Sequence, residues 1–103
     1  MNRTITALLF AVTYSVNAQQ TITKTYTIEP HTNLEGADLS GEDLSNLNLS
    51  FCNLVRANLS GTLLHVANLE GAMMEGANLE GANLEGANLS NAQLIDASFI
   101  GAN

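Results

Sequence analysis

Large apolar residues recur at every fifth position along most of this chain. Alanine usually stands two positions before each of them, and all eight glycines stand two positions after one. A fixed internal period of this kind specifies architecture as well as local structure. The apolar register comprises Leu34, Leu39, Leu44, Leu49, Leu54, Leu59, Leu64, Leu69, Met74, Leu79, Leu84, Leu89, Leu94 and Phe99.

A period of five suits neither a straight helix nor a straight strand. On a helix the apolar residues would lie about 140° apart, and on a strand they would alternate between faces. A short extended segment followed by a corner removes the conflict, because Ala82 and Leu84 then face one side and Asn83 the other. Gly86 would take the corner, where a positive φ suits glycine. If each corner turns a right angle, four units close a coil, and coils stack about 4.8 Å apart.

The units GANLEGANLEGANLS at residues 76–90 resemble the A-(D/N)-L-x-x signature of pentapeptide-repeat proteins. The resemblance covers residues 32–103 and implies an all-β fold. That fold is the family's right-handed quadrilateral parallel β-helix, here with about three and a half coils, and its Leu and Ala positions point inward. Six residues depart from the signature: Glu42, Leu47, Cys52, Thr62, Leu63 and Met73. Because burying a carboxylate is unfavourable, we expect the first coil to be loose or open to water near Glu42.

The first eighteen residues have the features of a secretory signal peptide. Arg3 supplies a positive start, residues 7–16 are mostly apolar, and small residues at Val16 and Ala18 fit a cleavage site. The segment is too short to span a membrane, and no second apolar stretch follows it. We therefore predict a signal peptide at 1–18 and export to the bacterial periplasm or medium. The alternative is a buried apolar helix or strand.

Residues 19–31 are predicted to form a strand that caps the repeats. Threonine alternates with other residues across 21–28, and Pro30 stops the pattern. The open end of a β-helix invites unwanted pairing, so a cap is the simplest role. A flexible tether is the alternative, and it fits less well with Ile22 and Tyr26.

Charge bears on the choice of partner. Ten acidic residues and three basic ones give a net charge of −7, which disfavours direct binding to nucleic acid or membranes. Some members of the pentapeptide-repeat family, which this sequence resembles, imitate a DNA duplex and inhibit gyrase. Glu70, Glu75, Glu80 and Glu85 would form a ring around the rod rather than a stripe along it, which argues against such mimicry.

No constellation of residues indicates catalysis, a metal or a cofactor. His31 and His65 have no further His or Cys at a spacing typical of zinc sites. Cys52 cannot form an intramolecular disulfide, and its inward position predicts a buried filler rather than a reactive thiol. A convex rod also lacks the concave pocket of most enzymes. We therefore expect a protein that is not an enzyme.

The final coil has no following segment in this sequence to cover it. Two interpretations remain open: two copies meet end to end and form a homodimer, or the last coil is frayed. For function, the first hypothesis is a non-catalytic exported scaffold or interaction module with an unknown protein partner. The alternative is a DNA-mimic inhibitor of a type II topoisomerase. The candidate end-to-end contact consists of Leu84, Leu89, Leu94, Phe99 and Ile100.

Overall fold

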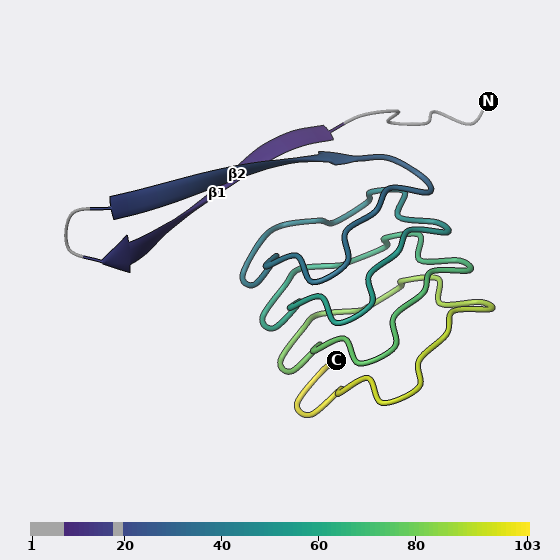
Figure 1. The fold of residues 1–103 in the computed structure, drawn as a ribbon. Coiled ribbons are helices and arrows are strands. Elements are labelled where there is room, and N and C mark those ends of the chain that lie inside the picture. The colour runs from purple at the N-terminus through teal and green to yellow at the C-terminus, as the bar shows by residue number, and fades with distance from the viewer. Residues whose placement is uncertain (1–7, 18–19) are drawn as a thin grey trace.

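A β-hairpin leads into a stack of coils in the computed structural model, which describes residues 8–17 and 20–103. Strand β1 (Leu8–Asn17) pairs antiparallel with strand β2 (Gln20–Ile28). Figure 1 shows the hairpin projecting sideways from one end of the stack, with the C-terminus at the other end. Among these residues, no helix is long and apolar enough to cross a membrane.

The coils repeat every twenty residues. Parallel bridges join Asn33 to Asn53 and Asn53 to Met73, and equivalent bridges run along the other three sides. The Leu34 N–H donates to the Asn53 carbonyl at 2.7 Å, and the Asn53 N–H donates to the Thr32 carbonyl at 3.0 Å. The predicted stacking of units four apart is therefore confirmed. Only single bridges form, rather than continuous strands, because a corner interrupts each side after a few residues.

Each corner is a tight turn with a hydrogen bond across it. The Ala37 N–H donates to the Leu34 carbonyl at 3.0 Å, and Gly36 between them has a φ of 67°. A positive φ at the third residue is the mark of a type II turn, which favours glycine there. The same position takes a positive φ at seven residues other than glycine: His31, Asn46, Phe51, Arg56, Val66, Asn91 and Asp96.

The interior is filled by the predicted apolar register. From Leu34 to Leu79, the large residue of every unit is at most 2 % exposed. Burying each such side chain contributes about 1.5–3 kcal/mol, so the stacked units share one core. Thr62 is fully buried in an alanine position, where its hydroxyl donates to the Leu39 carbonyl at 3.1 Å. Glu42 keeps part of its surface in water, which avoids the burial of its carboxylate.

The hairpin meets the coils at the end of β2. Ile28 is 1 % exposed and belongs to the core, whereas most of β2 runs away from the coils in Figure 1. Strand β1 occupies the apolar segment of the predicted signal peptide, and the predicted cleavage point after Ala18 lies outside the described residues. Cleavage there stays a prediction, and it would remove β1 and leave β2 without its paired strand.

Candidate interaction surfaces

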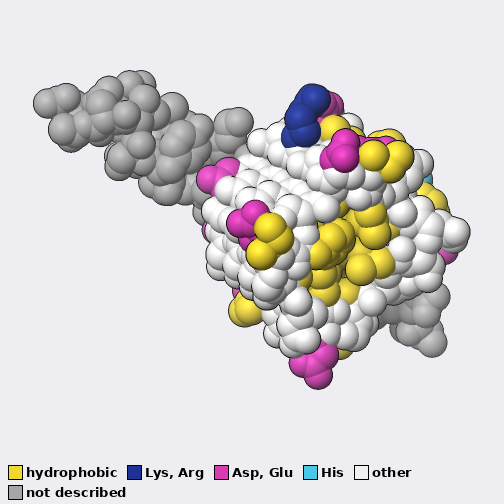
Figure 2. Space-filling view, turned by 90° about the horizontal axis from the view of Figure 1, so that it is seen from below, with side chains coloured by type: hydrophobic (Ala, Val, Ile, Leu, Met, Phe, Trp, Pro, Cys, Tyr) yellow, Lys and Arg dark blue, Asp and Glu magenta, His cyan; other side chains and the backbone are white. Residues whose placement is uncertain are grey.

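The last coil is less buried than the coils before it. Leu84, Leu89, Leu94 and Phe99 are only partly buried against the core, and Ile100 is 74 % exposed. Figure 2 views this end from below and shows hydrophobic side chains gathered at its centre. The five residues of the predicted end-to-end contact therefore lie on the final coil.

Backbone groups at the same end lack partners within the described residues. In earlier coils, the N–H of each large apolar residue donates to the next coil, as Leu64 does to Asn83 at 2.8 Å. Within residues 84–103, Leu84 still donates to Asn103 at 2.6 Å, whereas the N–H groups of Leu89 and Leu94 make no such bond.

Most outward polar residues in the middle of each side stabilise their own corner. The Asn48 Oδ1 accepts a hydrogen bond from the Ser50 N–H at 3.1 Å, and the Asn68 Oδ1 accepts one from the Glu70 N–H at 3.0 Å. The Asn88 side chain also donates to the Asn68 Oδ1 at 3.4 Å. These stacked amides support the backbone and one another.

Acidic side chains dominate the coils. Arg56 is bound to Glu35 at 2.6 Å, and this is the one ion pair formed among the described residues. His65 lies directly above Glu85 in the stack, because the Asn46 N–H donates to His65 and the Val66 N–H donates to Glu85, yet the two side chains do not pair. The acidic surface therefore stays largely uncompensated.

The hydrogen bonds at one corner lower the pKa of an acidic residue, Asp43. The Asp43 Oδ1 accepts a hydrogen bond from the Ser45 N–H at 3.0 Å. This bond, together with one from the Ser45 side chain, holds the pKa of Asp43 below its ordinary value. The carboxylate form is thus stabilised without any neighbouring cation.

Several large apolar side chains point outward instead of inward. Phe51 and Val66 stand at corners and are 47 % and 50 % exposed. Leu63 and Met73 stand in the middle of a side, where asparagine or aspartate is usual, and are 44 % and 36 % exposed. Leu63 and Met73 are departures that the repeat pattern identifies, whereas Phe51 was missed. Its signal in the sequence was an aromatic residue in a position that carries glycine in eight units.

The remaining candidates are the residues that could bind a metal ion and the thiol of Cys52. No group of three or more His, Cys, Asp or Glu side chains that could hold a metal ion forms within the described part of the chain. Cys52 is fully buried, its thiol contacts the Glu29 carbonyl at 3.2 Å, and burial raises its pKa. The predicted role of Cys52 as a buried filler is confirmed.

Coils that repeat every twenty residues, with an inward apolar register and turns at every fifth residue, define a β-helical repeat solenoid. The sequence pattern described as pentapeptide repeats matches residues 31–65, 43–81 and 74–103, with eight copies. The chain belongs to the pentapeptide-repeat family, and membership implies the right-handed β-helix. Proteins of this family are generally structural or interaction modules.

Solved structures similar to this chain are also pentapeptide-repeat proteins. HetL, involved in heterocyst differentiation regulation in the cyanobacterium Nostoc sp. strain PCC 7120, is 40 % identical over 71 % of this chain and 38 % of its own, with a TM-score of 0.42. The protein alr5209 from Nostoc PCC 7120 is 34 % identical over 67 % of this chain, with a TM-score of 0.39.

The plasmid-mediated fluoroquinolone resistance protein QnrB1 is 21 % identical over 73 % of this chain and 56 % of its own, with a TM-score of 0.48. This chain spans 61 % of the length of alr5209 and 38 % of the length of HetL. No match was found among curated proteins.

Proposed function

We propose that this protein is an exported, non-catalytic interaction module whose rod-shaped surface binds a partner protein. The observation that carries the proposal is the set of large apolar side chains in outward positions, represented by Phe51, Val66 and Met73. The repeat fills most equivalent positions elsewhere with glycine or polar residues, so the fold does not require apolar residues there. Exposed apolar surface that folding does not explain is typical of contact sites.

Two copies of the chain are proposed to meet through the final coil. The partly buried Leu89, Leu94 and Phe99 and the exposed Ile100 support this contact. A second copy would cover these apolar side chains.

Light scattering over a range of concentrations tests the dimer. We expect the mass of a dimer, and we expect Ile100→Lys to shift the protein toward the monomer because it places a charge in the contact. Leu63→Lys is the matched control, since Leu63 is also exposed and is bridged to Asn83 rather than to a residue of the final coil. A wild-type protein that stays monomeric at high concentration contradicts the contact.

The alternative function is a DNA-mimic inhibitor of a type II topoisomerase. Its support is the acidity of the coils, on which Arg56 is the one basic side chain that the structure describes. Stacking, however, places Val55 between Glu35 and Glu75, so this column of outward residues is interrupted. A continuous line of negative charge, as on a duplex backbone, does not form along this corner. The arrangement favours the interaction module.

Intact mass and location decide between the two functions. The full-length chain is expressed in a bacterium, and the periplasm, medium and cytoplasm are analysed by mass spectrometry. We expect a product that begins at Gln19 and is recovered outside the cytoplasm. An uncleaved cytoplasmic product would contradict export and would favour the topoisomerase inhibitor, for which inhibition of DNA supercoiling is then the direct assay.

A further inference from the structure

Two aromatic rings stack at one corner of the upper coils. The rings of His31 and Phe51 have centroids 5.2 Å apart and planes within 10° of parallel. They belong to successive coils, because the His31 N–H donates to the Ser50 carbonyl at 3.0 Å. Below them, the Phe51 ring covers Gly71, where an added Cβ would overlap the ring. Only glycine at 71 leaves room for the ring in this position.

Phe51 adopts an unfavourable backbone conformation at this corner. Its φ is 58°, in the left-handed region that bulky L-residues avoid. The residue is nevertheless 47 % exposed, so it is not a core side chain. Asn46 and Asn91 occupy equivalent corners with a residue type that tolerates this region. Strained, exposed residues of this kind occur preferentially at functional sites.

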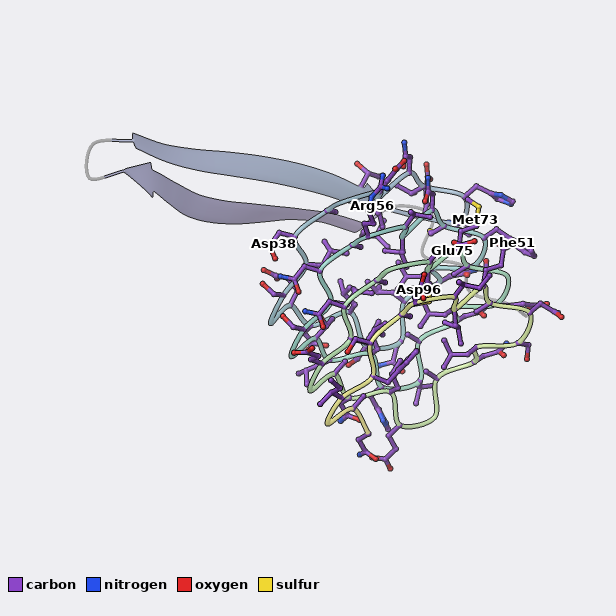
Figure 3. All side chains as sticks on the ribbon, turned by 60° about the horizontal axis from the view of Figure 1, so that its bottom comes forward. Asp38, Phe51, Arg56, Met73, Glu75 and Asp96 are labelled. Carbon is purple, nitrogen blue, oxygen red and sulfur yellow. The ribbon has the colours of Figure 1, made fainter. Side chains whose placement is uncertain are left out.

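Met73 extends the apolar surface beside this corner. It follows Gly71 by two residues, and its N–H donates to the carbonyl of Cys52, the neighbour of Phe51. Figure 3 shows Phe51 and Met73 on the same side of the coils, away from Asp38. Met73 is 36 % exposed in a position that Asn53 and Gln93 fill on the adjacent coils. We call His31, Phe51 and Met73 the corner patch.

Negative charge borders the corner patch. The Glu70 carbonyl accepts the Phe51 N–H at 2.8 Å, which places Glu70 directly below this corner, and Glu29 contacts Cys52 through its carbonyl. Neither carboxylate forms an ion pair within the described residues, where Arg56 binds Glu35 instead. The patch therefore combines an apolar centre with acidic neighbours that have no basic partner in this chain.

We propose that the corner patch binds a basic and apolar peptide segment of a partner protein. One aromatic or aliphatic side chain of the partner packs against Phe51 and Met73, and Lys or Arg residues beside it face Glu29 and Glu70. Aromatic and methionine side chains in a contact supply much of the affinity, and complementary charge sets specificity. This inference rests on the proposed interaction function and names the surface and the chemistry of its partner.

Fluorescence anisotropy with three labelled peptides tests the proposal on the purified full-length chain. The probe alternates Lys with Phe, and the two comparison peptides replace every Lys with Glu or every Phe with Ser. We expect the Lys–Phe peptide alone to bind, with affinity that falls as salt rises. We expect Phe51→Asn to weaken it about ten-fold or more and Glu70→Gln to weaken it a few-fold.

Matched variants separate binding from folding. Asparagine is the residue that the repeat itself uses at Asn46, so Phe51→Asn suits the backbone. Val66→Asn makes the same exchange at another corner, and we expect it to change affinity by less than about two-fold. Met73→Asn removes the second apolar member and should weaken binding without loss of circular dichroism signal.

Three results would overturn the inference: no binding of the Lys–Phe peptide by the wild type, equal binding of the Glu–Phe peptide, or equal effects of Phe51→Asn and Val66→Asn. The proposed function fails on different evidence, namely a product that is not exported. If the protein is exported but Phe51→Asn does not change its affinity for the peptide, only the inference about the corner patch is contradicted.

Discussion

The interior and the corners of this solenoid share one five-residue period but hold very different residues. The inward position at the centre of each unit carries leucine or methionine at no more than 2 % exposure from Leu34 to Leu79. Corner positions carry glycine eight times, yet also Phe51, Arg56 and Val66, at the same positive φ. Packing fixes the interior because every side chain there touches its neighbours. At the corners only the backbone conformation is fixed, so side chains there are free to serve another purpose.

Truncating an interior residue should produce the largest loss of stability. Leu59 is fully buried, so Leu59→Ala leaves a cavity and should lower the free energy of unfolding by about 2–5 kcal/mol. Ile95 is 71 % exposed, and Ile95→Ala should change it by less than about 0.5 kcal/mol. Urea denaturation followed by circular dichroism measures both. Similar losses in the two variants would contradict the division between interior and outward positions.

Adding a methyl group at two corners separates backbone strain from crowding. At Gly61 nothing lies within 4 Å of an added Cβ. Gly61→Ala should therefore lower the free energy of unfolding only through backbone strain, by about 1–2 kcal/mol. At Gly71 the Phe51 ring occupies the space of the added Cβ. Gly71→Ala should therefore lower the free energy of unfolding by about 1–3 kcal/mol more than Gly61→Ala does.

Replacing Phe51 by Asn in the Gly71→Ala variant should restore the stability that is lost to crowding by the ring. A double-mutant cycle measured by urea denaturation tests this. If the recovery is absent, the ring does not pack on Gly71.

Relieving strain at a corner should raise stability. Val66 is β-branched and has a φ of 58°, a conformation that asparagine tolerates better. We expect Val66→Asn to raise the free energy of unfolding by about 1 kcal/mol, because Val66 is 50 % exposed and little packing is lost. A rise in the melting temperature would support this estimate, whereas a clear fall would show that Val66 packs more tightly than its exposure indicates.

The smallest effect is expected at Asp43, and it depends on pH. Asparagine accepts the same corner hydrogen bond elsewhere, as Asn53 does from Val55 at 3.1 Å, so Asp43→Asn should leave the urea midpoint nearly unchanged at neutral pH. Hydrogen bonds from Ser45 lower the pKa of Asp43 in the folded state below its ordinary value.

The stabilisation from these bonds is therefore present above the unfolded pKa and is lost as the pH falls through the folded pKa. Acid titration should show the wild type losing stability relative to Asp43→Asn below about pH 4. A constant difference across that range would contradict this role of Asp43.

The sequence predicted the coils because each unit has only one way to bury its leucine beside those of its neighbours. Glycine at most corners indicated the positive φ of that position, and the structure confirms it. Phe51 was missed, although the period of twenty residues places it between His31 and Gly71. The stacking of its ring on His31 and over Gly71 depends on the side-chain conformation, which the repeat pattern does not specify.

The pairing of β1 with β2 was not anticipated either, since a short apolar run is compatible both with a signal peptide and with a strand. The final-coil residues were found from the period alone, because the period shows which leucines stand last.

The free energy of unfolding of Phe51→Asn tests the central claim most directly, namely that corner side chains are not required by the fold. Relief of the positive φ offsets the lost stacking on His31, so urea denaturation should give a value within about 1 kcal/mol of the wild type. A loss of about 3 kcal/mol or more, comparable to that expected for Leu59→Ala, would show that Phe51 belongs to the folded core and would contradict the account.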